Sequence, residues 1–339
     1  MIFLSMYVYC MLKLIARKLK DLNFFDTLHA GWMIASLASI SSTPPSSTFS
    51  YNGKYLASSS KDNSAIIWEI NAEGGEFSRK HKLEGHEKPV VLVLWSPDDK
   101  QVVTCGENEV IKRWDVGPSG QCLQTYGTVD VGSVSCGWLH DGSGIIGAMA
   151  DRRIYLWNLD GSEIEHVQGR SGHKLSEVAM TSDGKWLVSV GKEHNEISLF
   201  DREARDDEKV IVVDNMVTSF SFSRDSKYLL VNLITQEIQV WMIDGGGEVA
   251  CKVSELKGHK RRRFVIRSCF GGYDENFIAS GSEDSQVYIW HRGFEREPCC
   301  VLSGHGGAVN CVSWNPTDLH MLASGSDDKT IRIWGLDDE

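Results

Sequence analysis

Short runs of alternating apolar and polar residues recur along most of this chain. Near its end, three such runs follow one another at residues 308–314, 322–328 and 330–334, and Gly, Pro, Asn or Asp bounds each of them. Runs of this length and alternation are typical of short antiparallel strands that are joined by tight turns. One such unit cannot bury both of its faces, so it needs neighbours like itself.

The unit repeats from about residue 49 onward, and each copy ends in an aromatic residue. These aromatics lie 41 to 49 residues apart: Trp68, Trp114, Trp157, Phe200, Trp241, Trp290 and Trp334. Gly-His precedes four of them, at Gly85-His86, Gly172-His173, Gly258-His259 and Gly304-His305. A period in the forties, with Gly-His early and Trp-Asp late, as at Trp114-Asp115, is typical of WD40 repeats. The sequence therefore resembles the WD40-repeat family, which implies an all-β, seven-bladed WD40 β-propeller.

The first blade and the closure of the ring look incomplete. Only residues 47–50 stand where the first strand should be, and no recognisable outer strand is present for the seventh blade. We therefore predict a non-propeller segment at 1–47, partly helical or disordered and explained by a misplaced start or exon in the gene model, before a propeller at 48–339. On this interpretation the fourth strand of blade seven is absent or improvised. The alternative is that residues 1–10 or 32–40 supply the closing strand.

The family resemblance implies a hydrogen-bonded tetrad of His, Ser or Thr, Asp and Trp within a blade. A buried imidazole needs a partner for each nitrogen, and the indole N–H needs an acceptor. Three blades fit this pattern, the first with an amide in place of the carboxylate. Their residues are His86, Thr104, Asn108 and Trp114; His259, Ser280, Asp284 and Trp290; and His305, Ser324, Asp328 and Trp334. Because the arrangement repeats, it indicates scaffold rather than a catalytic triad.

Composition excludes several classes of function. The net charge of −11 argues against general nucleic-acid binding, which needs an excess of cations. The nine cysteines form no CxxC pair, and no Cys/His cluster has zinc spacing. No P-loop or H-E-x-x-H motif is present, and the G-x-G-x-x-G match at 142–147 enters a strand rather than a helix. We expect no catalytic residues, no cofactor, no metal and no small-molecule substrate.

One basic stretch departs from this acidic background. Residues 257–267 carry six cations and no acid, and Lys260, Arg261, Arg262 and Arg263 are consecutive. The repeat pattern places them on a loop at the rim of the propeller, before the first strand of blade six. They are the candidate partner-binding rim, with a solvated loop as the structural alternative.

The residues of blade six, 277–292, and of the last blade, 309–335, carry a closer resemblance. They resemble, in a plant-like form, the WD repeat-containing protein 26 family of WD subunits in GID/CTLH ubiquitin ligases. Members also carry a LisH-CTLH region, which the printed sequence lacks. The resemblance implies a cytoplasmic and nuclear scaffold without enzyme activity, whose partners are proteins (ligase subunits, substrates or regulators) rather than membranes or nucleic acid. There are two alternatives: a Gβ-like signalling scaffold, and a peptide or RNA reader that uses the basic rim.

Overall fold

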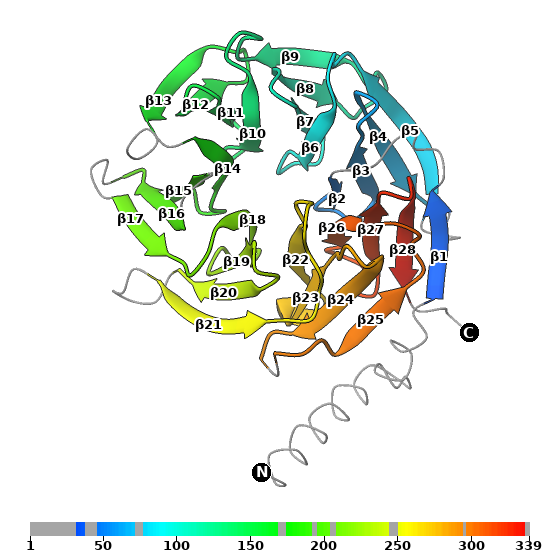
Figure 1. Ribbon diagram of the computed structural model, residues 1–339. Helices are drawn as coiled ribbons and strands as arrows, with labels where there is room; N and C mark the ends of the chain where they lie inside the picture. Colours follow the sequence, from blue (N-terminus) through cyan, green and yellow to red (C-terminus); the bar gives the residue numbers. More distant parts are fainter. Residues whose placement is uncertain are drawn as a thin grey trace, which may run out of the picture.

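The computed structural model describes residues 32–37, 46–71, 77–168, 174–191, 195–203, 208–243, 250–293 and 296–335. Within them, the chain forms seven four-stranded antiparallel sheets. The sheets are arranged radially around a central axis, with the first strand of each repeat innermost (Figure 1). This is the all-β, seven-bladed propeller that the repeat pattern predicts.

The strands follow the repeat closely, and the turn residues between the runs end each of them. Blade one contains β2 (Ser47–Phe49), β3 (Tyr55–Ser59), β4 (Ser64–Ile70) and β5 (Phe77–Glu84). Blade two contains β6 (Val90–Trp95), β7 (Gln101–Gly106), β8 (Ile111–Asp115) and β9 (Cys122–Tyr126). Blade three contains β10 (Ser133–Trp138), β11 (Gly144–Met149), β12 (Arg153–Asn158) and β13 (Glu163–Gln168).

Blades four to seven have the same order of strands. Blade four contains β14 (Leu175–Met180), β15 (Trp186–Gly191), β16 (Glu196–Asp201) and β17 (Glu208–Val212). Blade five contains β18 (Val217–Phe222), β19 (Tyr228–Leu233), β20 (Ile238–Met242) and β21 (Cys251–Leu256). Blade six contains β22 (Ser268–Gly271), a 3-10 turn η2 (Tyr273–Glu275), β23 (Phe277–Ser280), β24 (Gln286–His291) and β25 (Cys300–Ser303). Blade seven contains β26 (Val309–Trp314), β27 (Leu322–Ser326), β28 (Ile331–Gly335) and β1 (Trp32–Leu37).

The prediction of an incomplete first blade and an open ring is wrong. The strand β1 pairs antiparallel with β28 as the fourth strand of blade seven, in a register that runs from Trp32 opposite Gly335 to Leu37 opposite Ile331. Figure 1 shows β1, in blue, beside the red β28. The boundary at residue 47 is also wrong, because β1 and the start of β2 belong to the propeller. This pairing covers the outer edge of β28, whose backbone hydrogen-bonding groups would otherwise be unpaired.

Contacts between the first and last blades complete the ring. The Phe49 N–H donates to Ser313 Oγ at 3.1 Å, and Asn315 Nδ2 donates to the Gly53 carbonyl at 3.0 Å. Apolar side chains continue the seam: Phe49 and Trp68 of blade one share a buried cluster with Ile333 of blade seven. Similar clusters fill the space between other neighbouring blades, so the core of this protein is a circle of inter-blade layers.

The described residues contain no helix that is long and apolar enough to cross a membrane. The predicted motif Gly172-His173 and the N-terminal residues 1–10 lie outside the described residues.

Candidate functional site

The tetrad of blade seven forms as the family pattern implies. His305 Nε2 lies 2.7 Å from Ser324 Oγ, and Trp334 Nε1 donates to the same oxygen at 2.7 Å. His305 Nδ1 lies 2.8 Å from Asp328 Oδ2. Because Ser324 accepts from the indole and can donate its own proton to Nε2, the imidazole proton belongs on Nδ1, facing the carboxylate.

The environment of Asp328 keeps that carboxylate ionised. Burial by itself would raise the pKa of Asp328, but hydrogen bonds from Thr330, from the Gly306 N–H and from His305 outweigh burial and lower the pKa to about 2. Burial lowers the pKa of His305 despite Asp328, so the imidazole is neutral near pH 7. The tetrad is therefore a neutral histidine between a hydroxyl and a carboxylate, and it locks the loop before β26 to the turn between β27 and β28.

Blade two forms a tetrad with a different acid. His86 Nε2 lies 2.7 Å from Thr104 Oγ1, which also accepts from Trp114 Nε1 at 2.8 Å. The predicted fourth member, Asn108, is not part of it. Instead Glu109, 4% exposed, places Oε2 2.7 Å from His86 Nδ1.

Glu109 takes the place predicted for Asn108 because of the local backbone conformation. Asn108 has a φ of 49° and projects into solvent in the turn, so its amide cannot reach the histidine. Glu109 is one residue further on, and its longer side chain reaches back to His86 while Oε1 accepts the Glu87 N–H at 3.0 Å. The absence of a side chain at Gly106 leaves room for this carboxylate. The adjacent Glu was the available sequence signal.

The structure does not bring the predicted tetrad of blade six together. Trp290 Nε1 donates to the Lys257 carbonyl at 2.9 Å rather than to Ser280, whose hydroxyl donates to the Gly281 carbonyl at 3.0 Å. His259 lies edge-on to Trp290, 2% exposed, and its Nδ1 has no hydrogen-bond partner among the described residues. Burial, and secondarily the charge of Arg261, lowers the pKa of His259 to about 4.

The loop that carries the basic rim explains why blade six differs. The N–H groups of Arg262, Arg263 and Phe264 all donate to Glu283 Oε1, at 2.6, 2.6 and 2.9 Å. Glu283 lies in the turn between β23 and β24, so this turn anchors the loop between β21 and β22. The Lys260 N–H donates to Ser282 Oγ at 2.8 Å, whereas in blade seven the corresponding Gly306 N–H donates to the tetrad carboxylate.

The four predicted rim residues have different surroundings. Arg262 and Arg263 are exposed. Arg261 is 9% exposed, and its Nε donates to the Phe264 carbonyl at 2.8 Å. Lys260 Nζ lies 3.5 Å from Asp284 Oδ2. Two of the four side chains are therefore presented to solvent without a partner that the described residues provide.

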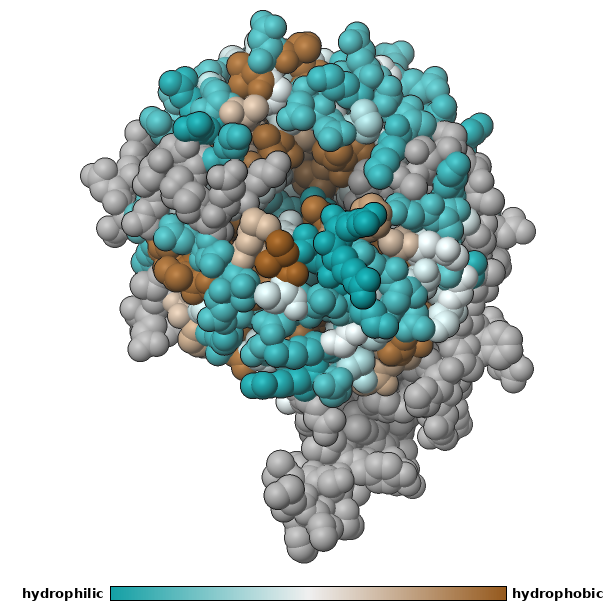
Figure 2. Space-filling view, in the orientation of Figure 1, coloured by the Kyte–Doolittle hydropathy of each residue, from teal (hydrophilic) through white to brown (hydrophobic). Residues whose placement is uncertain are grey.

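An ion pair missed at the sequence level lies beside this loop. Arg267 Nη1 contacts Glu177 Oε1, and Glu177 Oε2 accepts the Phe220 N–H at 2.9 Å. Glu177 is on β14, Phe220 is on β18 and Arg267 immediately precedes β22, so one carboxylate links blades four, five and six near the axis. Figure 2 shows one face of the ring, hollowed near its centre, with hydrophobic residues along part of the hollow. No sequence spacing relates Glu177 to Arg267.

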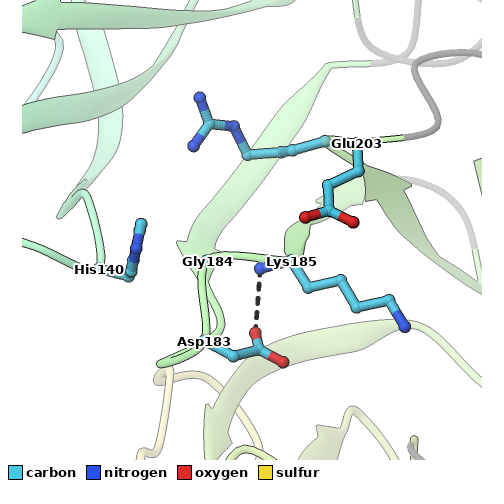
Figure 3. A pocket seen from close by; sticks show the side chains of 6 residues that line it. His140, Asp183, Gly184, Lys185 and Glu203 are labelled. Atoms are coloured by element: carbon cyan, nitrogen blue, oxygen red, sulfur yellow. Dashed lines mark hydrogen bonds between the residues drawn. The ribbon is translucent and has the colours of Figure 1, made fainter.

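A cleft of about 500 Å³ lies between blades three and four, lined by His140, Asp183, Gly184, Lys185, Arg202 and Glu203. Figure 3 shows His140 on one side of it, and Lys185 and Glu203 on the other. The Lys185 N–H donates to Asp183 Oδ1 at 3.0 Å, within the turn between β14 and β15. The lining mixes two acids with two bases and an imidazole, all on exposed turns, so it selects no particular ligand charge.

Metal-binding chemistry has no candidate in the described part of the chain. No group of three His, Cys, Asp or Glu side chains there could hold an ion. Burial raises the pKa of the Cys269 and Cys300 thiols to about 12. Such thiols are protonated at neutral pH and behave as small apolar groups.

Comparisons with known proteins agree with this architecture. The family model described as "WD domain, G-beta repeat" matches residues 28–69, 77–115, 250–291 and 296–335. A WD repeat-containing protein 26 homolog from Arabidopsis thaliana is 62% identical over 289 residues, which cover 85% of this chain and 48% of that protein. GID complex subunit 7 of Schizosaccharomyces pombe is 37% identical over 297 residues, covering 86% and 56%.

A third relative, WD repeat-containing protein WDS homolog of Arabidopsis thaliana, is 45% identical over 291 residues, which cover 85% of this chain and 54% of that protein. The chain thus spans about half the length of the curated relatives it matches. The first matched segment, 28–69, includes β1, in agreement with its place in blade seven. The repeats, the ring of seven sheets and these relatives agree, and the chain therefore belongs to the WD40-repeat family.

Proposed function

We propose that this protein is a non-enzymatic subunit of a GID/CTLH-type E3 ubiquitin ligase, in which its propeller contacts substrates or regulators for ubiquitin-dependent degradation. The observation that carries this proposal is the similarity to GID complex subunit 7 and to a WD repeat-containing protein 26 homolog, which covers 86% and 85% of this chain. We place this activity in the cytoplasm and nucleus.

The features of the propeller support a binding role. The His-containing tetrads of blades two and seven hold loops, and their hydroxyl groups, on Thr104 and Ser324, are fully buried. Nucleophilic catalysis needs an accessible nucleophile beside oxyanion donors. What the propeller offers to solvent is a ring of loops, and binding residues are commonly found on loops that a rigid scaffold positions.

Affinity purification tests the proposal. The full chain, tagged at its C-terminus, is expressed in cells of its source and captured at mild salt, and co-purifying proteins are identified by mass spectrometry. We expect RING and CTLH subunits of the ligase, which a second tagged WD40 propeller used as control should not capture. A folded propeller that captures no ligase subunit would contradict the proposal, and capture of G-protein subunits instead would favour the Gβ-like alternative.

A further inference from the structure

The loop between β21 and β22 is held in one conformation by a single carboxylate. Three successive N–H groups, from Arg262, Arg263 and Phe264, converge on Glu283 Oε1. The hydrogen bonds lower the pKa of Glu283 although burial opposes them, so the acceptor is charged at neutral pH. Charge-assisted hydrogen bonds are shorter and stronger than neutral ones. The backbone of this loop is therefore fixed before any partner arrives.

The fixed backbone turns four consecutive side chains toward solvent. Arg262 and Arg263 are exposed, Phe264 is 36% exposed and Val265 is 50% exposed. Two guanidinium groups without an ion-pair partner in the described part of the chain thus lie next to an aromatic ring and an aliphatic side chain. Arginine and aromatic residues are enriched among the residues that dominate protein interfaces. The combination offers two charge-assisted contacts and one apolar contact on adjoining residues.

Beneath this surface lies a third cation, Arg261, whose charge is offset in part by the nearby carboxylate of Glu283. Arg261 is 9% exposed, and its Nη1 is buried without a hydrogen-bond partner among the described residues. No carboxylate of those residues forms a salt bridge with it. Burying a cation is costly when no direct ion pair compensates it, and the charge raises the positive potential of the surface above it. An acidic group that approached Arg262 and Arg263 would offset part of that cost.

We propose that residues 260–265 form a docking site for an acidic peptide segment of a partner protein. Carboxylates of the segment pair with Arg262 and Arg263, and an apolar side chain of the segment packs on Phe264 and Val265. The proposal deepens the proposed function, since it names the chemistry of a substrate or regulator that the propeller would present to the ligase.

The charge distribution favours an acidic protein segment over a nucleic acid. The chain has a net charge of −11, and binding of extended nucleic acid requires many phosphate contacts along a basic surface. On this loop, Lys260 forms an ion pair with Asp284, and Arg267 forms one with Glu177. The exposed cations that remain available to a partner are Arg262 and Arg263. A short segment with a few carboxylates matches that footprint. Pre-organisation of the loop by Glu283 reduces the conformational entropy that binding would otherwise cost.

The test uses purified full chain and fluorescence polarisation. The probe is a short fluorescein-labelled peptide that repeats Asp-Glu-Phe, and a Lys-Lys-Phe peptide is the charge control. We expect only the acidic probe to bind, and binding to weaken as salt rises. The double variant Arg262→Ala/Arg263→Ala keeps the backbone donors to Glu283, and it should weaken the acidic probe about tenfold, since exposed ion pairs each contribute modestly. The reversal Arg262→Glu/Arg263→Glu should transfer binding to the basic peptide.

A matched pair of cations elsewhere controls for net charge. Lys100 and Lys227 are exposed on the turns after β6 and β18, at the opposite ends of the strands, and pair loosely with their own aspartates at 3.6 and 3.8 Å. The variant Lys100→Ala/Lys227→Ala should bind the acidic probe within about twofold of the original chain, because surface pairs of this kind contribute little. Phe264→Ala should weaken the probe without changing its salt dependence.

Several results would overturn the docking site. Unchanged binding by Arg262→Ala/Arg263→Ala would do so, as would equal binding of both peptides, or displacement of the acidic probe by oligouridine RNA at lower concentration than by unlabelled peptide. Failure here is distinguishable from failure of the proposed function. The loop variants should still capture RING and CTLH subunits if the ligase role is correct.

Discussion

Ser324 and Ser280 hold the same position in blades seven and six, but the structure assigns them different energetic roles. Ser324 Oγ is fully buried and serves both Trp334 Nε1 and His305 Nε2, each at 2.7 Å. Ser280 Oγ is equally buried, yet it donates only to the neighbouring Gly281 carbonyl. The matched substitutions Ser324→Ala and Ser280→Ala therefore separate tetrad formation from burial alone.

The magnitudes follow from the groups that each substitution leaves unpaired. Ser324→Ala leaves a buried indole N–H and an imidazole nitrogen without a hydrogen-bond partner. Each unsatisfied group costs about 1–3 kcal/mol, so we expect a loss of about 2–6 kcal/mol. Ser280→Ala removes one donor, while Trp290 keeps its bond to the Lys257 carbonyl, so we expect a loss of about 1 kcal/mol or less.

Urea denaturation followed by tryptophan fluorescence and far-UV circular dichroism measures both losses from the shift in midpoint. Equal midpoint shifts for the two variants would refute the assignment of a closed tetrad to blade seven and an open one to blade six. A larger shift for Ser280→Ala would refute it as well.

Three further predictions concern other parts of the ring. Glu109→Ala should destabilise the chain by about 2–4 kcal/mol, because His86 Nδ1 and the Glu87 N–H both lose their partner. Asn108→Gly should be nearly neutral, because glycine tolerates the positive φ of this position. If urea denaturation showed a larger loss for Asn108→Gly than for Glu109→Ala, the Glu109 tetrad would be contradicted. Removing residues 1–38 deletes β1, so it should lower the thermal midpoint and promote association through the exposed edge of β28, whereas removing residues 1–28 should do neither. Calorimetry measures the midpoint, and light scattering measures the association. His259 has a folded pKa of about 4, below its usual value of about 6.5, so between pH 6.5 and pH 4 the unfolded chain binds more protons than the folded chain. The free energy of unfolding should therefore fall by about 3 kcal/mol as the pH drops through this range. His259→Gln should flatten this part of the stability–pH curve, and an unchanged slope would contradict the buried neutral histidine.

Repeated local signals made the propeller predictable. Each repeat carries its own turn residues and its own strand-ending aromatic, and in the WD40 family such repeats pack side by side around a common axis. In the last repeat, the alternating runs at 308–314, 322–328 and 330–334 overlap β26, β27 and β28. The period of Trp and Phe residues fixes the number of blades for the same reason.

Ring closure by residues 32–40 was only an alternative at the level of the sequence, because β1 (Trp32–Leu37) contains neither the Gly-His nor the Trp-Asp pair that marks the repeat. Its residues Trp32–Leu37 are mostly apolar and could form a strand or part of a helix, and short apolar runs are ambiguous by periodicity. What selects the strand is the open edge of β28, nearly three hundred residues later in the chain. A free edge with unpaired N–H and C=O groups favours any segment that can pair with it.

The candidate sites show the same division between local and tertiary information. The sequence by itself determined which residues could form tetrads, since residue type and spacing are local, and blade seven follows that pattern. Only the tertiary structure decided that Glu109 replaces Asn108, that Glu283 holds the basic loop, and that blade six stays open. Hydrogen bonds need a particular distance and direction, and the loop backbone that sets both is positioned by neighbouring turns and blades rather than by the motif itself.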